Sequence, residues 1–184
     1  MKAESDSSAR RDDGPAERRP IILVTEDDKN MRELIAAVVN ESEMPLEVVT
    51  AENAHEAMDF LENHDAAVVL TDLRMPGADG LDLLRFVKAR DPQTQVVLIT
   101  GYATVDSAVA ALKQGAYDYV QKPFDTVKLL GVVERALDYH LLCTENQRLR
   151  RQRRAFEEAG EIIGQSQAKE RVERLIAAAA AYDS

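Results

Sequence analysis

The sequence predicts a doubly wound α/β domain, built on a five-stranded parallel sheet with five helices. Short apolar runs rich in β-branched residues alternate along the chain with segments of helical periodicity. Such runs are typical of strands buried on both faces, and strands that alternate with helices form right-handed βαβ units. The five runs are IILV (21–24), EVVT (47–50), AAVVL (66–70), QVVLIT (95–100) and YDYVQ (117–121).

Helical patterns fill the intervals between these runs, and local signals support several of their boundaries. Asp28 can cap the first helix, Gly115 can end the fourth, and Asp125 can begin the fifth. We expect Gly80 to start the third helix. The patterns are MRELIAAVV (31–39), NAHEAMDFLE (53–62), GLDLLRFVK (80–88), TVDSAVAALKQG (104–115) and TVKLLGVVERALDYHLL (126–142).

The flanks of this domain differ from it in composition. Residues 1–19 have almost no large apolar side chains, so we expect a disordered tail. Residues 20–140 form the predicted domain and hold 10 basic and 21 acidic side chains, a balance that argues against nucleic-acid binding there. Residues 141–160 reverse the sign, with five arginines against three glutamates. Their basic run, RLRRQRR, has no interleaved aromatic residues, and we expect no direct DNA binding by this chain.

The fifth helix is expected to continue into a helical linker over residues 141–160. Apolar residues recur there every seven positions, which suits the pairing of two helices. Glu145 and Gln152 occupy the second core position of this repeat, so a short coiled coil and a simple solvated helix both remain open. The residues of the stripe are Leu142, Leu149, Phe156 and Ile163.

Several features bear on the cellular compartment. No apolar stretch approaches the roughly 20 residues that span a bilayer. The opening MKAESDSSARRDDGPAERRP lacks the apolar segment of a secretory signal. The single cysteine, Cys143, cannot form an internal disulfide, which agrees with a reducing compartment. We therefore expect a cytoplasmic protein without membrane contact.

Polar residues follow four of the predicted strands. In an open parallel sheet, ligands bind beyond the carboxyl ends of the strands, at the point where the winding reverses. The predicted fold therefore gathers carboxylates, a hydroxyl and an ammonium in one crevice. They are Glu26, Asp27 and Asp28 after the first strand, Asp72 after the third, Thr100 after the fourth and Lys122 after the fifth.

This set of groups indicates a particular chemistry. Clustered carboxylates repel one another, and a hard divalent cation relieves the repulsion; oxygen ligands with room for waters favour Mg²⁺. Asp72 is a competent nucleophile without a separate base, because an ionised carboxylate carries the charge already. Lys122 supplies a point charge for a phosphoryl oxygen, and Thr100 supplies a hydroxyl donor. These are the parts needed for phosphoryl transfer onto a carboxylate.

Four motifs occur together in the order and spacing of a known family: TEDD (25–28), LTDLRMPGADG (70–80), LITGYA (98–103) and YVQKPFD (119–125). Residues 20–140 thus resemble the receiver domain of bacterial two-component response regulators. The resemblance implies a CheY-like fold with strand order 2-1-3-4-5. It also implies phosphorylation of Asp72 by a partner histidine kinase, a reaction that the domain assists without being a classical enzyme.

The resemblance also implies roles for individual residues. Glu26, Asp27, Asp72 and the backbone carbonyl of Arg74 match the Mg²⁺ site, although Glu26 falls where the family more often has Asp. Thr100 and Tyr119 match the switch pair, and Lys122 matches the family's lysine, which precedes a cis peptide bond. Phosphorylation would shift the face formed by the fourth helix, the fifth strand and the fifth helix. We expect a homodimer through that face, through the linker helix or through both.

The segment EIIGQSQAKERVERLIAAAAAYDS (161–184) resembles the opening of the AAA+ domain of NtrC-type activators, which act with sigma-54 RNA polymerase. No phosphate-binding G-x-x-x-x-G-K-[ST] motif occurs in the sequence, so contact with the polymerase and ATP binding by that route would need the missing part of that domain. We expect a truncated piece of a larger activator. A natural single-domain regulator with a remnant tail is the alternative.

Two other functions use similar parts. A hydrolase with an aspartyl-phosphate intermediate usually carries a second Asp two residues after the nucleophile, where this chain has Arg74. A pseudo-receiver would keep the fold and serve only as a dimerisation module. Binding of beryllofluoride would separate that module from a phospho-acceptor.

Overall fold

A computed structural model describes residues 19–101 and 105–164 of the chain, with side chains described for 19–101 and 108–156. The chain divides into two compact units, Met1–Leu137 and Asp138–Ser184. Residues 1–18 of the predicted disordered tail and residues 165–184 of the predicted AAA+ fragment lie outside the described residues.

Five parallel strands form one sheet in the order β2-β1-β3-β4-β5, which confirms the predicted fold class and strand order. The strands are β1 (Ile21–Thr25), β2 (Glu47–Ala51), β3 (Val68–Asp72), β4 (Gln95–Thr100) and β5 (Asp118–Gln121). The central strands β1, β3 and β4 are almost wholly buried, as the sequence predicts. The edge strands β2 and β5 contain exposed residues, because each has a neighbouring strand on one side only.

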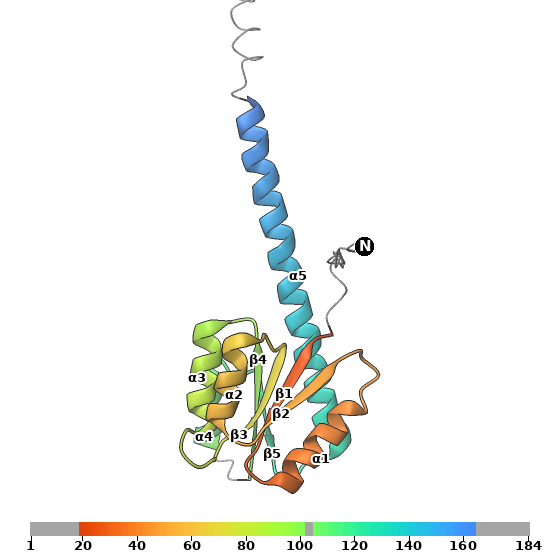
Figure 1. Ribbon diagram of the computed structural model, residues 1–184, viewed down its shortest axis with the longest axis vertical. Helices are drawn as coiled ribbons and strands as arrows, with labels where there is room; N and C mark the ends of the chain where they lie inside the picture. Colours follow the sequence, from red (N-terminus) through yellow and green to blue (C-terminus); the bar gives the residue numbers. More distant parts are fainter. Residues whose placement is uncertain (1–18, 102–104, 165–184) are drawn as a thin grey trace, which may run out of the picture. The chain divides into compact units, whose positions relative to one another are not determined.

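The described helices cover both faces of the sheet (Figure 1). They are α1 (Lys29–Asn40), α2 (Ala54–Asn63), α3 (Gly80–Arg90), α4 (Val105–Lys113) and α5 (Thr126–Gly164). One apolar cluster joins the sheet to α1 and to the part of α5 up to Leu137, and a second joins it to α2, α3 and α4. None of the helices in the described part of the chain has the length and apolar character that crossing a bilayer requires.

Local interactions begin and end the helices where the sequence predicts. The Asp28 side chain accepts a hydrogen bond from the Met31 amide at 2.8 Å at the start of α1. The Asp125 side chain accepts one from the Val127 amide, also at 2.8 Å, at the start of α5. Gly115 follows α4 with a φ of +96°, the left-handed conformation that favours glycine after a helix.

The loop between β3 and α3 brings the start of a helix against the end of a strand. Gly80 is the first residue of α3, and its amide donates to the Leu73 carbonyl at 3.1 Å. A Cβ added to Gly80 would lie 2.2 Å from the carbonyl oxygen of Asp72. Asp79 and Asp82 close this turn as a reciprocal capping box. The position of α3 therefore depends on a close backbone approach to Asp72.

The substitution Gly80→Ala tests this close approach. Backbone atoms cannot move aside as a flexible side chain can, so we expect the free energy of unfolding to fall by about 1–3 kcal/mol. Urea denaturation measures it. Gly131→Ala, within α5, is the matched control: its Cβ would meet only the end of the flexible Arg135 side chain, at 3.4 Å. We expect that control to be neutral or stabilising by about 0.5–1 kcal/mol, since alanine favours helix. Equal effects of the two substitutions would contradict the role of Gly80.

Candidate functional site

Three carboxylates meet at the carboxyl edge of the sheet. Glu26 and Asp27 follow β1, and Asp72 ends β3, which pairs directly with β1. One carboxylate oxygen of each residue lies within 4.8 Å of the others. Glu26 is buried, Asp72 is half-buried and Asp27 is exposed, so the cluster opens to solvent on the Asp27 side. The structure thus brings together three of the four carboxylates that the strand pattern gathers, while the fourth, Asp28, caps α1.

Lys122 places its ammonium group between two of these carboxylates. Its Nζ donates to Glu26 Oε2 and to Asp72 Oδ2, both at 2.6 Å. The Lys122 amide donates to the Thr100 carbonyl at 2.8 Å, which fixes the residue after β5 against the end of β4. One cation therefore serves two acidic groups from two other strands.

Burial and charge act in opposite directions at this bridge. Burial raises the pKa of Glu26 above its ordinary value, although hydrogen bonding and attraction from Lys122 pull it down. Burial alone would lower the pKa of Lys122, but its hydrogen bonds to Asp72 and Glu26, with their charges, raise it instead. Lys122 therefore stays an ammonium, and Glu26 is the carboxyl that burial disfavours in its charged form.

Asp72 is held by a second partner on its other oxygen. The backbone amide of Arg74 donates to Asp72 Oδ1 at 3.0 Å, while Oδ2 accepts from Lys122. The Leu73 amide donates to the Ile99 carbonyl at 3.3 Å and extends the pairing of β3 with β4 beyond the strand end. These contacts fix the orientation of the carboxylate relative to the sheet.

Thr100 and Tyr119 lie on the same face of the sheet. Leu98 pairs with Tyr119 in the register of β4 and β5, and Thr100 lies two residues after Leu98. Leu98 belongs to the apolar cluster beneath α2, α3 and α4, and Tyr119 packs against that cluster. Tyr117 packs on the opposite face. The predicted switch pair therefore shares one face, with Thr100 buried at the end of β4.

This arrangement agrees with comparisons to known proteins. Residues 22–134 match the model of the response regulator receiver domain. The chain belongs to this receiver domain family.

Relatives and solved structures extend the comparison. The chain is 35% identical over 159 residues to the DNA-binding transcriptional regulator NtrC of Escherichia coli (strain K12), a match that covers 86% of this chain and 33% of NtrC. The receiver domain of a putative LuxO repressor protein from Vibrio parahaemolyticus superposes with a TM-score of 0.64 at 28% identity, over 68% of this chain and 95% of that domain. NtrX from Brucella abortus does so with a TM-score of 0.65 at 34% identity, over 72% and 30%.

The chain spans about a third of the length of the curated relatives that it matches. The match of residues 22–134 shows that the chain carries the receiver domain of a two-component response regulator.

Sequence reasoning missed one residue beside the acidic cluster of this receiver domain. Arg32, in the first turns of α1, donates from Nη1 to the carbonyl oxygen of Glu26 at 2.5 Å and to that of Asp27 at 3.4 Å. Both acceptors are main-chain atoms, so no motif of side chains points to the contact. The only signal in the sequence is an arginine five residues after Asp27.

The residues of the cluster fit a Mg²⁺ ion. All the donors are oxygens, the ligands that this ion prefers, and the exposed Asp27 leaves room for the waters that Mg²⁺ retains. Glu26 and Asp72 already share one cation, Lys122, and Asp27 forms no ion pair within the described residues. A divalent ion would therefore add positive charge where the net charge of the cluster is negative.

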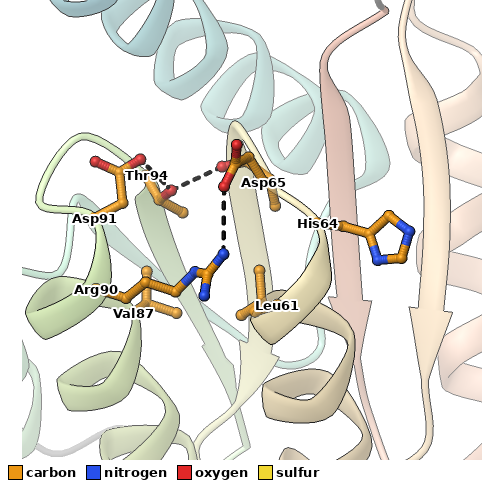
Figure 2. A pocket seen from close by; sticks show the side chains of 8 residues that line it. Leu61, His64, Asp65, Val87, Arg90, Asp91 and Thr94 are labelled. Carbon is orange, nitrogen blue, oxygen red and sulfur yellow. Dashed lines mark hydrogen bonds and ion pairs between the residues drawn. The ribbon is translucent and has the colours of Figure 1, made fainter.

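A small cavity at the opposite edge of the sheet does not share the chemistry of the acidic cluster (Figure 2). Its volume of about 10 Å³ is close to that of a single water site. The Thr94 hydroxyl donates to the Ala66 carbonyl at 2.8 Å, and Arg90 pairs with Asp65 at 3.6 Å. Arg90 also donates to the Glu62 carbonyl at 3.1 Å. These groups satisfy one another and tie α2 to α3.

The substitution Lys122→Met tests the shared cation. Glu26, with its side chain 2% exposed, would lose its cationic partner, and we expect the metal-free domain to lose on the order of 3 kcal/mol of stability near neutral pH. The raised pKa of Glu26 means that the folded state holds the proton more tightly than the unfolded chain does. Stability of the variant should therefore rise as the pH is lowered from about 8 to about 5.

Urea denaturation with a chelator present, at both pH values, provides the measurement. Lys29→Met is the matched control, because Lys29 forms an exposed ion pair with Glu33 at 3.8 Å. That control should change the stability by less than about 0.5 kcal/mol. If Lys122→Met loses equally little stability, or if its loss shrinks as the pH rises, Lys122 does not stabilise the charged form of Glu26.

Proposed function

We propose that Asp72 of this receiver domain accepts a phosphoryl group from a phosphohistidine of a partner histidine kinase. The observation that carries the proposal is the Lys122 ammonium, 2.6 Å from both Glu26 and Asp72 at the carboxyl edge of the sheet. In the transfer, an Asp72 oxygen forms a bond to phosphorus as the bond from phosphorus to the histidine nitrogen breaks. Asp72 needs no base, because its ionised carboxylate is already the nucleophile.

We propose that Mg²⁺ is the cofactor of this step. Asp27, Asp72 and the backbone carbonyl of Arg74 would hold it directly, and Glu26 would contact it through water. When bound, the ion would neutralise charge on the phosphoryl oxygens. Lys122 would stabilise a phosphoryl oxygen on Asp72, and the Thr100 hydroxyl would donate a hydrogen bond to the same phosphoryl group. The Arg74 amide, bonded to Asp72 Oδ1 at 3.0 Å, orients the carboxylate for attack.

The output of phosphorylation is a shift between two populations of the domain. Thr100 would move toward the phosphoryl group, and Tyr119, on the same face of the sheet, would fill the space it leaves. The α4-β5-α5 face would then change its shape. Apolar side chains on this face reach solvent: Val109 and Leu112 of α4 are 43% and 45% exposed, and Val127 of α5 is 79% exposed. Such side chains suit a contact that forms or breaks with the switch.

The wider function is control of a sigma-54-dependent transcription activator. NtrC, to which the chain is 35% identical, is a DNA-binding transcriptional regulator. Residues 141–160 would act as the linker that transmits the switch, and residues 161–184 as the first part of an AAA+ domain. Within α5, Leu142, Leu149 and Phe156 are 70%, 52% and 82% exposed, and they form the stripe through which two linkers would pair.

Light scattering with Mg²⁺, and then with Mg²⁺ and beryllofluoride, tests the phospho-acceptor. Beryllofluoride mimics the phosphoryl group, and we expect it to change the fraction of dimer in the wild type and to have no effect on Asp72→Asn. Amide NMR shifts would report binding independently of mass. Beryllofluoride binding without a change in mass would mean that phosphorylation does not act through dimerisation. Absence of Mg²⁺-dependent binding in the wild type would leave the dimerisation module as the function.

Two double variants locate the dimer contact. Leu142→Ser with Leu149→Ser removes the linker stripe, and Val109→Ser with Leu112→Ser removes the exposed apolar side chains of α4. We expect the variant at the true contact to weaken dimerisation about tenfold or more, since two buried leucine-sized side chains contribute several kcal/mol. Sedimentation velocity over a concentration series measures it. If both variants dimerise like the wild type, both proposed surfaces are wrong.

A further inference from the structure

We propose that Arg32 is a positioning residue, which sets the geometry of the acidic cluster by holding the main chain of Glu26 and Asp27. The inference rests on the proposed function of this cluster as a Mg²⁺ and phosphoryl site. It assigns a role to a side chain that does not touch the reacting atoms.

The main chain of Glu26 is fixed on both sides. Its amide donates to the Ala51 carbonyl of β2 at 3.2 Å, which continues the pairing of β1 with β2. Its carbonyl accepts from Arg32 Nη1 at 2.5 Å, a charge-assisted and therefore strong hydrogen bond. The peptide planes before and after Glu26 are thus both held, and with them the direction in which the Glu26 side chain leaves the backbone.

The same guanidinium reaches the next residue. Arg32 Nη1 lies 3.4 Å from the Asp27 carbonyl oxygen, so one rigid group spans two consecutive carbonyls. Asp28 then caps α1 through the Met31 amide, so each of the three residues after β1 has a fixed main-chain or capping contact. A planar, rigid and weakly hydrated guanidinium suits this task better than the strongly hydrated ammonium of lysine on its flexible stem.

Removal of Arg32 should change the Mg²⁺ affinity in opposite directions, depending on whether Arg32 acts through its charge or by positioning the main chain. A guanidinium near the carboxylates repels a divalent cation, so removing it should tighten Mg²⁺ binding if Arg32 acted only through its charge. If Arg32 positions the main chain, its removal loosens the ligand geometry and weakens Mg²⁺ binding. Residues that orient metal ligands without touching the metal change the metal affinity by about 10–100-fold when they are lost. The sign of the change therefore identifies the role.

Amide NMR titration with MgCl₂ at constant ionic strength measures the affinity for the wild type, Arg32→Met, Arg32→Gln and Arg32→Lys. We expect Arg32→Met and Arg32→Gln to bind Mg²⁺ about tenfold more weakly than the wild type, with Arg32→Lys in between. If Arg32→Met does not fold, Arg32→Gln carries the test. Unchanged or tighter Mg²⁺ binding in the folded neutral variants would overturn the proposal.

Arg90→Met is the matched control. Arg90 also donates to a main-chain carbonyl, that of Glu62, but at the opposite edge of the sheet. We expect it to lower the thermal stability measured without metal while leaving the Mg²⁺ affinity unchanged. If Arg90→Met loses as much Mg²⁺ affinity as Arg32→Met does, general destabilisation explains the loss in both variants, and the proposal is overturned. A wild type that binds no Mg²⁺, or an Asp72→Asn variant that binds it normally, would instead contradict the proposed function.

Discussion

Repulsion between carboxylates at one edge of a parallel sheet is the constraint on which the site depends. Glu26 is buried, and a buried charge is tolerated only with a partner. Lys122 provides that partner and serves Asp72 as well, at 2.6 Å to each. The domain can therefore keep the carboxylate of Asp72 half-buried without losing its fold. The same ammonium lies where an incoming anionic group would meet it.

The topology of the sheet allows one lysine to pair with two carboxylates. β1 lies between β2 and β3, so the residues after β1 and at the end of β3 meet at one edge. β5 lies at the far side of β4, and only a long side chain after it reaches back to β1 and β3. Lysine has that reach together with a flexible stem. Layers of helices on both faces exclude water from the central strands β1, β3 and β4, whereas Asp27 at the carboxyl edge stays exposed.

Much of this arrangement could be predicted from the sequence. β-branched runs and glycine positions indicated the strands and the start of α3, and the position of Asp72 after a buried strand indicated that it would lie beside Glu26 and Asp27. The capping box of Asp79 and Asp82 was readable from its spacing but was not predicted. The contact of Arg32 with the Glu26 carbonyl could not be predicted, because it depends on the angle at which α1 leaves the sheet. Side-chain spacing carries no information on main-chain acceptors of this kind.

The bridge of Lys122 also bears on the order of folding events. Its two hydrogen bonds join residues that are 96 and 50 positions apart in the chain. Contacts of such long range form only after the intervening loops have closed, so they contribute little to a transition state built from local helices and neighbouring strands. Their stabilisation then appears mainly as slower unfolding. The bridge from Lys122 to Glu26 and Asp72 would thus also slow the unfolding of the completed sheet.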